Sequence, residues 1–300
     1  MGYYNSRKSF AALAFAAAAF FITSCGDKSV SLESYSVNKV MHVVASDIPD
    51  SAQTYFNISL SLVFPKNVAS DSVAAKISKS IILEAYDDTT LLKLSPKEAT
   101  DAFLASQMDG YKDEISFARQ RRKEFIKNGE NPPAFLLHNS ELSLKTSSVY
   151  NDNGILSLRM EKSLYDGGAH SLPMIKLLSY SHKTGDRIFL EDIFQEGYES
   201  KVRDEIVAAI MRDKGFEAEE QMLMSGYFGL GTLEPTQNFL LKEDTITFLY
   251  NPYEIGSYSL GCVEVPVALN AVSNVLRADN QTVTALIKSQ AKEKKEQDWK

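Results

Sequence analysis

Apolar positions along the chain repeat with two different periods, which predicts both strands and helices. The run Thr54–Phe64 alternates apolar and polar residues, as expected of a strand with one buried face. The run Ser70–Tyr86 has an apolar residue at every fourth position, which predicts an amphipathic helix. The apolar positions are Tyr55, Leu60, Leu62 and Phe64 in the first run and Val73, Ile77, Ile81 and Ala85 in the second.

A second helix is predicted to begin at Ser95-Pro96-Lys97-Glu98. Ser95 is the expected N-cap, proline suits the first helical position, and Glu98 completes a capping box. Asn128-Gly129 ends this helix, since both residues tolerate the left-handed conformation that closes a helix.

A chain of hairpins follows. Ala134–Tyr150 and Gly154–Leu164 are predicted to pair around a loop of turn residues. Gly167-Gly168 then forms a turn that ends at His170, and the apolar run Leu172–Tyr180 predicts the next strand.

The second half of the chain repeats this mixture of helix and strand. Tyr198–Lys214 is predicted to be an amphipathic helix ended by Gly215, and Gln237–Leu241 with Thr245–Tyr250 to be a hairpin. Cys262–Val267 predicts a further strand. The expected fold class is therefore α+β, with antiparallel sheets and packed helices in two α/β units after a signal peptide. We place the units at residues 35–164 and 165–287, and a charged tail at 288–300.

The first 24 residues have the pattern of a secretory signal peptide. Arg7 and Lys8 precede thirteen apolar residues, Phe10–Ile22, which make about 20 Å of helix, short of the roughly 30 Å needed to span a membrane. The segment Ile22-Thr23-Ser24-Cys25 resembles a bacterial lipobox, so Cys25 is predicted to be the first mature residue and to carry lipid. Residues 25–34 are then a linker, and the protein is expected in the cell envelope, membrane-attached through its N-terminal lipid.

Charge excludes one class of partner. The 300 residues contain 44% hydrophobic and 24% charged side chains, enough for an ordinary core. Removing Arg7 and Lys8 from 32 basic residues leaves 30 against 39 acidic ones, a net charge of −9. Such a chain repels nucleic acid and attracts a basic protein. If Cys25 is lipidated, Cys262 has no disulfide partner, and we expect it to be a small buried residue.

Candidate chemistry is sparse. The four histidines lack the spacing of a zinc helix, and no Gly-x-Ser-x-Gly nucleophile motif occurs. We therefore expect no metal and no cofactor. His170 and His182 could meet across a hairpin beside Asp166 or Asp186, which leaves a metal site or a hydrolytic acid/base pair as alternatives. The tyrosine-rich segment Tyr250–Tyr258 is typical of a surface that binds proteins or sugars. The alternative is that Tyr253 and Tyr258 anchor this loop on the core.

Three ordered segments together resemble a known extracellular domain. They are Asp166-Gly167-Gly168-Ala169-His170, Thr184-Gly185 with Leu190-x-Asp192-Ile193-Phe194, and Phe248-x-Tyr250-Asn251-Pro252-Tyr253-Glu254-Ile255. They resemble the domain of RsiV-type anti-sigma factors and PdaC-type peptidoglycan deacetylases, and residues 35–164 resemble the domain that precedes it. The chain shows neither a sigma-binding segment nor a deacetylase domain. The resemblance therefore implies only the binding module, which in RsiV-type proteins binds lysozyme.

These observations predict a lipid-anchored envelope protein without catalytic activity, whose C-terminal unit binds a lysozyme-like protein or peptidoglycan. The resemblance of the Ser24-Cys25-Gly26 junction to Bacteroides-like lipoproteins places it at the outer membrane. The alternatives are a cell-wall hydrolase or esterase that uses His170 or His182, and a structural envelope scaffold. The predicted ligand-binding residues are His170, Tyr250, Tyr253, Glu254 and Tyr258.

Overall fold

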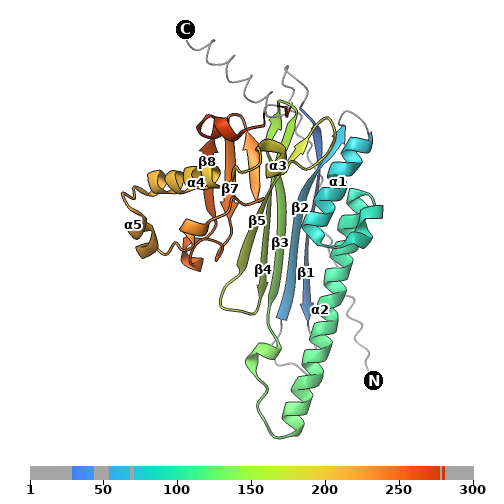
Figure 1. Cartoon of the computed structure of the whole chain (residues 1–300). Coiled ribbons are helices and arrows are strands. Elements are labelled where there is room, and N and C mark those ends of the chain that lie inside the picture. The colour runs from blue at the N-terminus through green and yellow to red at the C-terminus, as the bar shows by residue number, and fades with distance from the viewer. Residues whose placement is uncertain (1–28, 44–53, 68–70, 278, 281–300) are drawn as a thin grey trace, which may run out of the picture.

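The computed structural model describes residues 29–43, 54–67, 71–277 and 279–280, and these form two sheets with helices (Figure 1). The fold is α+β, as predicted. Cys25 and residues 288–300 lie outside the described residues. No helix in the described part is both long and apolar enough to cross a membrane.

The larger sheet has the strand order β1-β2-β3-β4-β5. β2 and β3 are parallel, whereas the other neighbours are antiparallel. The two helices α1 and α2 connect the parallel pair and cover one face of this sheet (Figure 1). The strands are β1 (Ser31–Val43), β2 (Thr54–Asn67), β3 (Ser140–Asp152), β4 (Ile155–Asp166) and β5 (Leu172–Ser181), and the helices are α1 (Asp71–Tyr86) and α2 (Pro96–Lys127).

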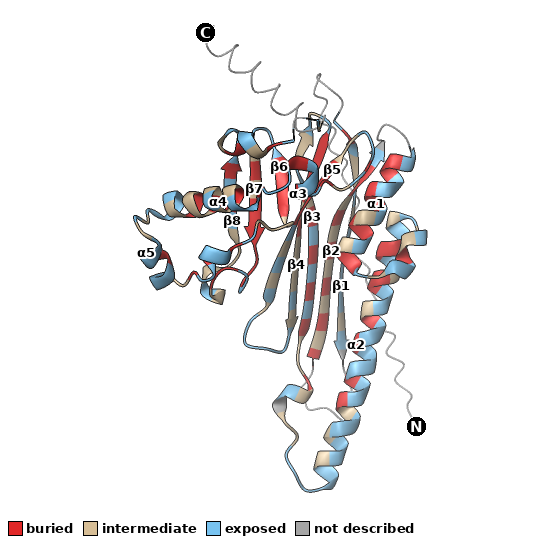
Figure 2. Ribbon diagram, in the orientation of Figure 1, coloured by how far each residue is buried: buried red, intermediate tan, exposed pale blue. Residues whose placement is uncertain are grey.

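The first core lies between this sheet and its helices. In β2 the alternating residues Phe56, Ile58, Leu60, Leu62 and Phe64 are all buried. Tyr55, which we grouped with Leu60, therefore lies on the other face, because the side chains of a strand alternate with a period of two. Burial follows this alternation along β2, while the far end of α2 is mostly exposed (Figure 2).

The N-terminus of α2 has the predicted cap. The hydroxyl oxygen of Ser95 accepts a hydrogen bond from the Glu98 N–H at 3.4 Å, and the Glu98 carboxylate accepts one from the Ser95 N–H at 3.0 Å. This reciprocal pair is a capping box.

The smaller sheet has the order β6-β7-β8 and is antiparallel throughout. It lies beyond β5, away from α1 and α2, and α4 packs against it (Figure 1). Gly215 ends α4 with φ of 68°, as predicted for a helix-ending glycine. The elements are β6 (Phe239–Lys242), β7 (Thr245–Tyr250), β8 (Val263–Ala268), α3 (Leu190–Ile193), α4 (Glu199–Lys214) and α5 (Glu219–Met224), with short 3-10 turns at Thr89–Lys93, Ala134–Leu136, Leu230–Thr232, Tyr258–Leu260 and Leu269–Val275.

Buried serine hydroxyls join the two sheets. Ser157 in β4 donates a hydrogen bond to the Leu241 carbonyl at 2.6 Å, and the Leu241 N–H donates to Ser179 in β5 at 3.0 Å. Both serines have no more than 1% exposure. The face of the larger sheet that α1 and α2 leave open is therefore covered at β4 and β5 by β6.

Two of the predicted boundaries fall inside strands. The predicted linker 25–34 overlaps β1, because residues 31–34 pair with β2. The boundary after residue 164 lies inside β4, and β5, which follows it, belongs to the larger sheet.

Candidate functional site

The structure brings together three of the predicted ligand-binding residues, which we call the aromatic site: His170, Tyr253 and Tyr258. The rings of His170 and Tyr258 are stacked with centroids 4.2 Å apart, and those of Tyr253 and Tyr258 are 5.8 Å apart. His170 comes from the turn between β4 and β5, and both tyrosines come from the loop between β7 and β8. The Tyr258 hydroxyl donates a hydrogen bond to the Ser171 carbonyl at 2.9 Å, which fixes one segment against the other.

The loop holds Tyr253 in an unusual conformation. Its φ is 72°, a left-handed value that non-glycine residues seldom adopt. The Tyr253 N–H donates to the Gly256 carbonyl, and the Asn251 N–H donates to the Glu254 carboxylate at 2.7 Å. A Cβ at Gly256 would lie 2.3 Å from Leu260 Cδ1 and 3.2 Å from the Gly226 carbonyl oxygen, so the Leu260 side chain would have to move to accommodate it. The result is a hydrogen-bonded turn in which Tyr253 is 61% exposed.

Two asparagine side chains, one just before β6 and one just after β7, attach the smaller sheet to the outer edge of β5. The Asn251 amide accepts a hydrogen bond from the Ile175 N–H at 2.8 Å and donates to the Ile175 carbonyl at 3.1 Å. Asn238 accepts from the Leu177 N–H at 2.7 Å and donates to the same Ile175 carbonyl at 2.9 Å. The two amides, which we call the asparagine clamp, take the place of a sixth strand along this stretch.

The other two predicted ligand-binding residues have structural roles. Tyr250 is only 3% exposed and donates to the Glu234 carbonyl, so a ligand cannot contact it. Burial raises the pKa of Tyr250, which keeps its hydroxyl protonated. Glu254 is exposed, but its carboxylate accepts the Asn251 N–H and so shapes the loop.

The predicted meeting of His170 and His182 is wrong. The two residues lie at opposite ends of β5, whose ten residues span on the order of 30 Å. His182 is half-buried, which lowers its pKa, and its buried Nε2 has no hydrogen-bond partner. The two imidazoles therefore cannot act on one substrate group.

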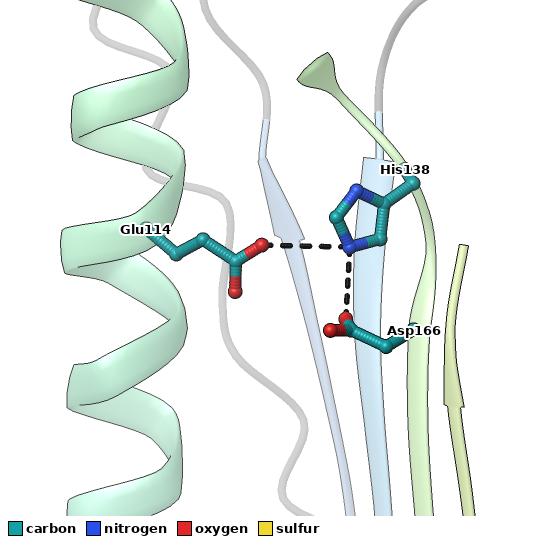
Figure 3. Close-up of side chains that lie close together, drawn as sticks. All are labelled: Glu114, His138 and Asp166. Atoms are coloured by element: carbon teal, nitrogen blue, oxygen red, sulfur yellow. Dashed lines mark hydrogen bonds and ion pairs between the residues drawn. The ribbon is translucent and has the colours of Figure 1, made fainter. Parts of the chain in front are cut away.

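A second cluster of functional groups was not predicted. Glu114 of α2, His138 before β3 and Asp166 at the end of β4 converge at one end of the inner strands β3 and β4 (Figure 3). The His138 Nε2 lies 2.8 Å from Asp166 Oδ1 and 3.4 Å from Glu114 Oε1. The ligand atoms of these three residues lie within 4.8 Å of one another, so the group could hold a metal ion.

The pKa shifts in this cluster favour a protonated His138 beside an ionised Asp166. Burial lowers the pKa of His138, but the hydrogen bonds to Asp166 and to the Phe135 carbonyl, together with the nearby charges of Asp166 and Glu114, outweigh this effect and leave the pKa raised. The Ser140 hydroxyl donates to Asp166 Oδ1 at 2.7 Å, and this bond, together with His138, lowers the pKa of the Asp166 carboxyl.

The arrangement differs from that of a serine hydrolase. Ser140 and His138 both bond the same Asp166 oxygen. In a catalytic triad the histidine stands between the serine and the acid, so that it can take the serine proton. Ser140 therefore lacks the base that would activate it.

A cavity of about 420 Å³ opens between α4 and β8. Cys262 lines it and is partly buried, with its thiol 3.7 Å from the Asn251 side-chain oxygen. Burial raises the pKa of Cys262, which favours the unreactive protonated thiol. The expectation of a buried Cys262 is therefore met only in part, since the residue is half-buried at the wall of this cavity. The cavity is lined by Ala209, Ile210, Arg212, Asp213, Lys214, Tyr227, Ser259, Leu260, Cys262, Val263, Glu264, Val265 and Pro266.

Comparison with known proteins assigns a family to the region that contains the smaller sheet. Residues 191–270 match the family described as "Protein of unknown function (DUF3298)". No curated protein sequence matches the chain.

Two solved structures share the fold. A member of the DUF3298 family from Bacteroides fragilis is 22% identical, with a TM-score of 0.76, and the alignment covers 86% of this chain and 99% of the other. A DUF3298 family protein from Pseudomonas aeruginosa PAO1 is 12% identical, with a TM-score of 0.52, over 85% and 97% of the two chains. Residues 191–270, which contain Tyr253 and Tyr258, are therefore a DUF3298 domain within a chain whose fold is similar to those of DUF3298 family proteins.

Proposed function

We propose that the chain is a lipid-anchored binding protein of the bacterial cell envelope that recognises a lysozyme-like protein through the aromatic site. The observation that carries the proposal is the exposed Tyr253, which the loop holds at positive φ against Tyr258. A strained, exposed residue that its surroundings fix firmly is a common mark of a binding site. Tyrosine also supplies a large contact area at a low cost in side-chain entropy.

Charge supports a protein ligand with a basic surface. After removal of the first 24 residues the chain has a net charge of −9, which speeds encounter with a positively charged partner. The resemblance to RsiV-type ectodomains supports lysozyme as the first ligand to test. Peptidoglycan is the second, because stacked aromatic rings also suit sugar rings.

Binding of lysozyme to immobilised protein, residues 26–300, tests the proposal, with purified peptidoglycan as a parallel arm. Tyr253→Ala should weaken binding about 30-fold, which corresponds to about 2 kcal/mol for a central tyrosine. Phe117→Ala is the matched control, since Phe117 is similarly exposed at 66% but lies on α2. If the protein binds neither ligand, or if both variants bind equally, the proposed function is wrong.

The anchor is tested separately. Palmitate labelling in a Gram-negative host should mark the chain and place it in the outer-membrane fraction, and Cys25→Ser should abolish both results. Soluble, unlabelled wild-type protein would contradict the lipid anchor but leave the binding proposal standing.

A further inference from the structure

The hydrogen bonds around His138 leave its Nε2 facing only acceptors. The His138 Nδ1 lies 3.2 Å from the Phe135 carbonyl oxygen, which carries no hydrogen, so the proton of this bond belongs to Nδ1. The Nε2 of a neutral ring then has a lone pair. It points at Asp166 and Glu114, whose ionised carboxylates can only accept (Figure 3). An electropositive centre, either a proton or a cation, must lie where these three groups converge.

Hydrogen bonds from neighbouring groups orient two of the three side chains, His138 and Asp166, as is common for metal ligands. A histidine that binds metal through Nε2 commonly donates its other N–H to a backbone carbonyl, as His138 does to Phe135. Ligating carboxylates are themselves hydrogen-bonded, as Asp166 is by the 4% exposed Ser140. The Tyr111 hydroxyl also reaches the His138 carbonyl at 3.4 Å. The imidazole and Asp166 are therefore positioned before any ion arrives.

Gly167 brings the Asp166 turn close to the imidazole. Its φ is 72°, and a Cβ at this position would lie 2.5 Å from the His138 Cγ. Any other residue would push the turn and the ring apart. The close approach of Asp166 to His138 thus depends on a glycine at this position.

We propose that Glu114, His138 and Asp166 form a binding site for a divalent transition-metal ion, with Zn²⁺ as the best match. One imidazole nitrogen and two carboxylate oxygens form a donor set that suits zinc. Ca²⁺ and Mg²⁺ prefer sites made of oxygen alone.

The spacing of the donors fits the ion. Ligand bonds of about 2.0–2.2 Å in a tetrahedron place donor atoms roughly 3.4 Å apart, and the Nε2 to Glu114 distance is 3.4 Å. The 2.8 Å distance to Asp166 opens by about half an ångström when the ion replaces the proton. Glu114 and Asp166 are about half exposed, with side-chain values of 46% and 56%. The fourth position is thus open to water or to a ligand group.

Zinc titration of the full chain in detergent, in competition with a chromophoric chelator, tests the site. We expect one tight site per chain, with Co²⁺ giving the visible absorption of a tetrahedral complex in its place. His138→Asn should weaken the site at least about 100-fold, beyond the 10–100-fold typical of losing an outer partner of a ligand. Asparagine can still donate to the Phe135 carbonyl, so this variant removes the ligand atom alone. Asp166→Asn and Glu114→Gln should also weaken it.

His42→Asn is the matched control, because it removes an exposed histidine from β1. It should leave the tight site unchanged. Far-UV circular dichroism of each variant separates loss of the site from loss of the fold. The proposal is overturned if the wild-type chain and a folded His138→Asn variant bind zinc with the same affinity, or if neither binds zinc. It is equally overturned if His42→Asn has the same effect as His138→Asn. The zinc titration does not involve lysozyme, so the zinc-site proposal can fail while the proposed function stands.

Discussion

The two ends of the turn from Asp166 to His170 show how five consecutive residues serve two different environments. At one end, Asp166 lies among charged and hydrogen-bonded groups, with His138 and Ser140 as partners. At the other end, the exposed His170 ring stacks on Tyr258 in a cluster of aromatic rings. The first end is suited to binding a small cation, and the second to contact with the broad surface of a protein ligand. One short turn therefore joins the larger sheet and α2 to the DUF3298 domain.

The largest expected effect tests how strictly the Asp166 end is built. Gly167→Ala should lower the free energy of unfolding by about 2–3 kcal/mol, because alanine is strained at positive φ and its Cβ would collide with His138. Gly168→Ala is the control, since φ there is not in the left-handed region and the nearest atom to an added Cβ is 4.0 Å away. Urea denaturation of both variants measures the difference. Equal destabilisation would show that the turn does not depend on Gly167.

The next effect concerns what holds the aromatic end. Asn251→Ala removes two hydrogen bonds to Ile175 and should cost about 2 kcal/mol, since the Ile175 N–H loses its partner and the Ile175 carbonyl keeps only the bond from Asn238. Lysozyme binding should fall together with stability, because the same loop carries Tyr253. Asn270→Ala, at an exposed position after β8, should change neither quantity. Full binding by a destabilised Asn251→Ala would separate the clamp from the site.

A smaller effect tests whether the two ends communicate. If a cation at His138 and Asp166 orders the turn, chelation should weaken lysozyme binding about fivefold, which corresponds to a coupling of about 1 kcal/mol. Isothermal titration with and without added Zn²⁺ measures this coupling. By reciprocity, lysozyme should tighten zinc binding by the same factor. Identical affinities would show that the ends are independent.

The smallest effect concerns His182, which lies at the opposite end of the larger sheet from His138 and whose pKa is lowered where that of His138 is raised. Burial lowers the pKa of His182 in the folded chain, and a backbone hydrogen bond with Ile155 and the nearby Asp152 offset this only in part. As the pH falls through the ordinary histidine value of about 6.5, the unfolded chain binds the proton first, so His182 lowers stability at acid pH. His182→Asn should therefore lose less stability than wild type between about pH 7 and pH 5 in chemical denaturation. Parallel pH curves for the two proteins would contradict this.

Local patterns in the sequence were sufficient for most helices and hairpins. The capping box at Ser95 and the left-handed glycine at Gly215 are determined by neighbouring residues, and both were predicted. The stacking of His170 on Tyr258 was not visible in the spacing, but the prediction that both bind ligand placed them in one site. The burial of Tyr250 was missed, because a tyrosine at the end of a strand has the same residue type whether it faces the core or solvent.

The cluster around His138 could not be found from spacing. Its members come from three elements, and only the register of β3 against β4 brings His138 near Asp166. The tight loop pairs Asp152 with Ile155, but a bulge between Ser148 and Tyr150 shifts the register by one residue. Counting back from the loop would therefore place the wrong residue beside Asp166, since a shift of one residue moves every side chain to the other face. A histidine before one strand and an aspartate at the end of its partner was the only available signal.

The asparagine clamp also has a consequence for the order of folding. β5 is an edge strand, and an edge with free peptide groups invites pairing with another chain. Its closing groups, Asn238 and Asn251, lie 61 and 76 residues beyond the backbone groups they bond. During synthesis from the N-terminus, the larger sheet can assemble long before these residues emerge. Until then a nascent chain carries an open edge, so a truncation between β5 and Asn238 should yield protein that aggregates through that edge.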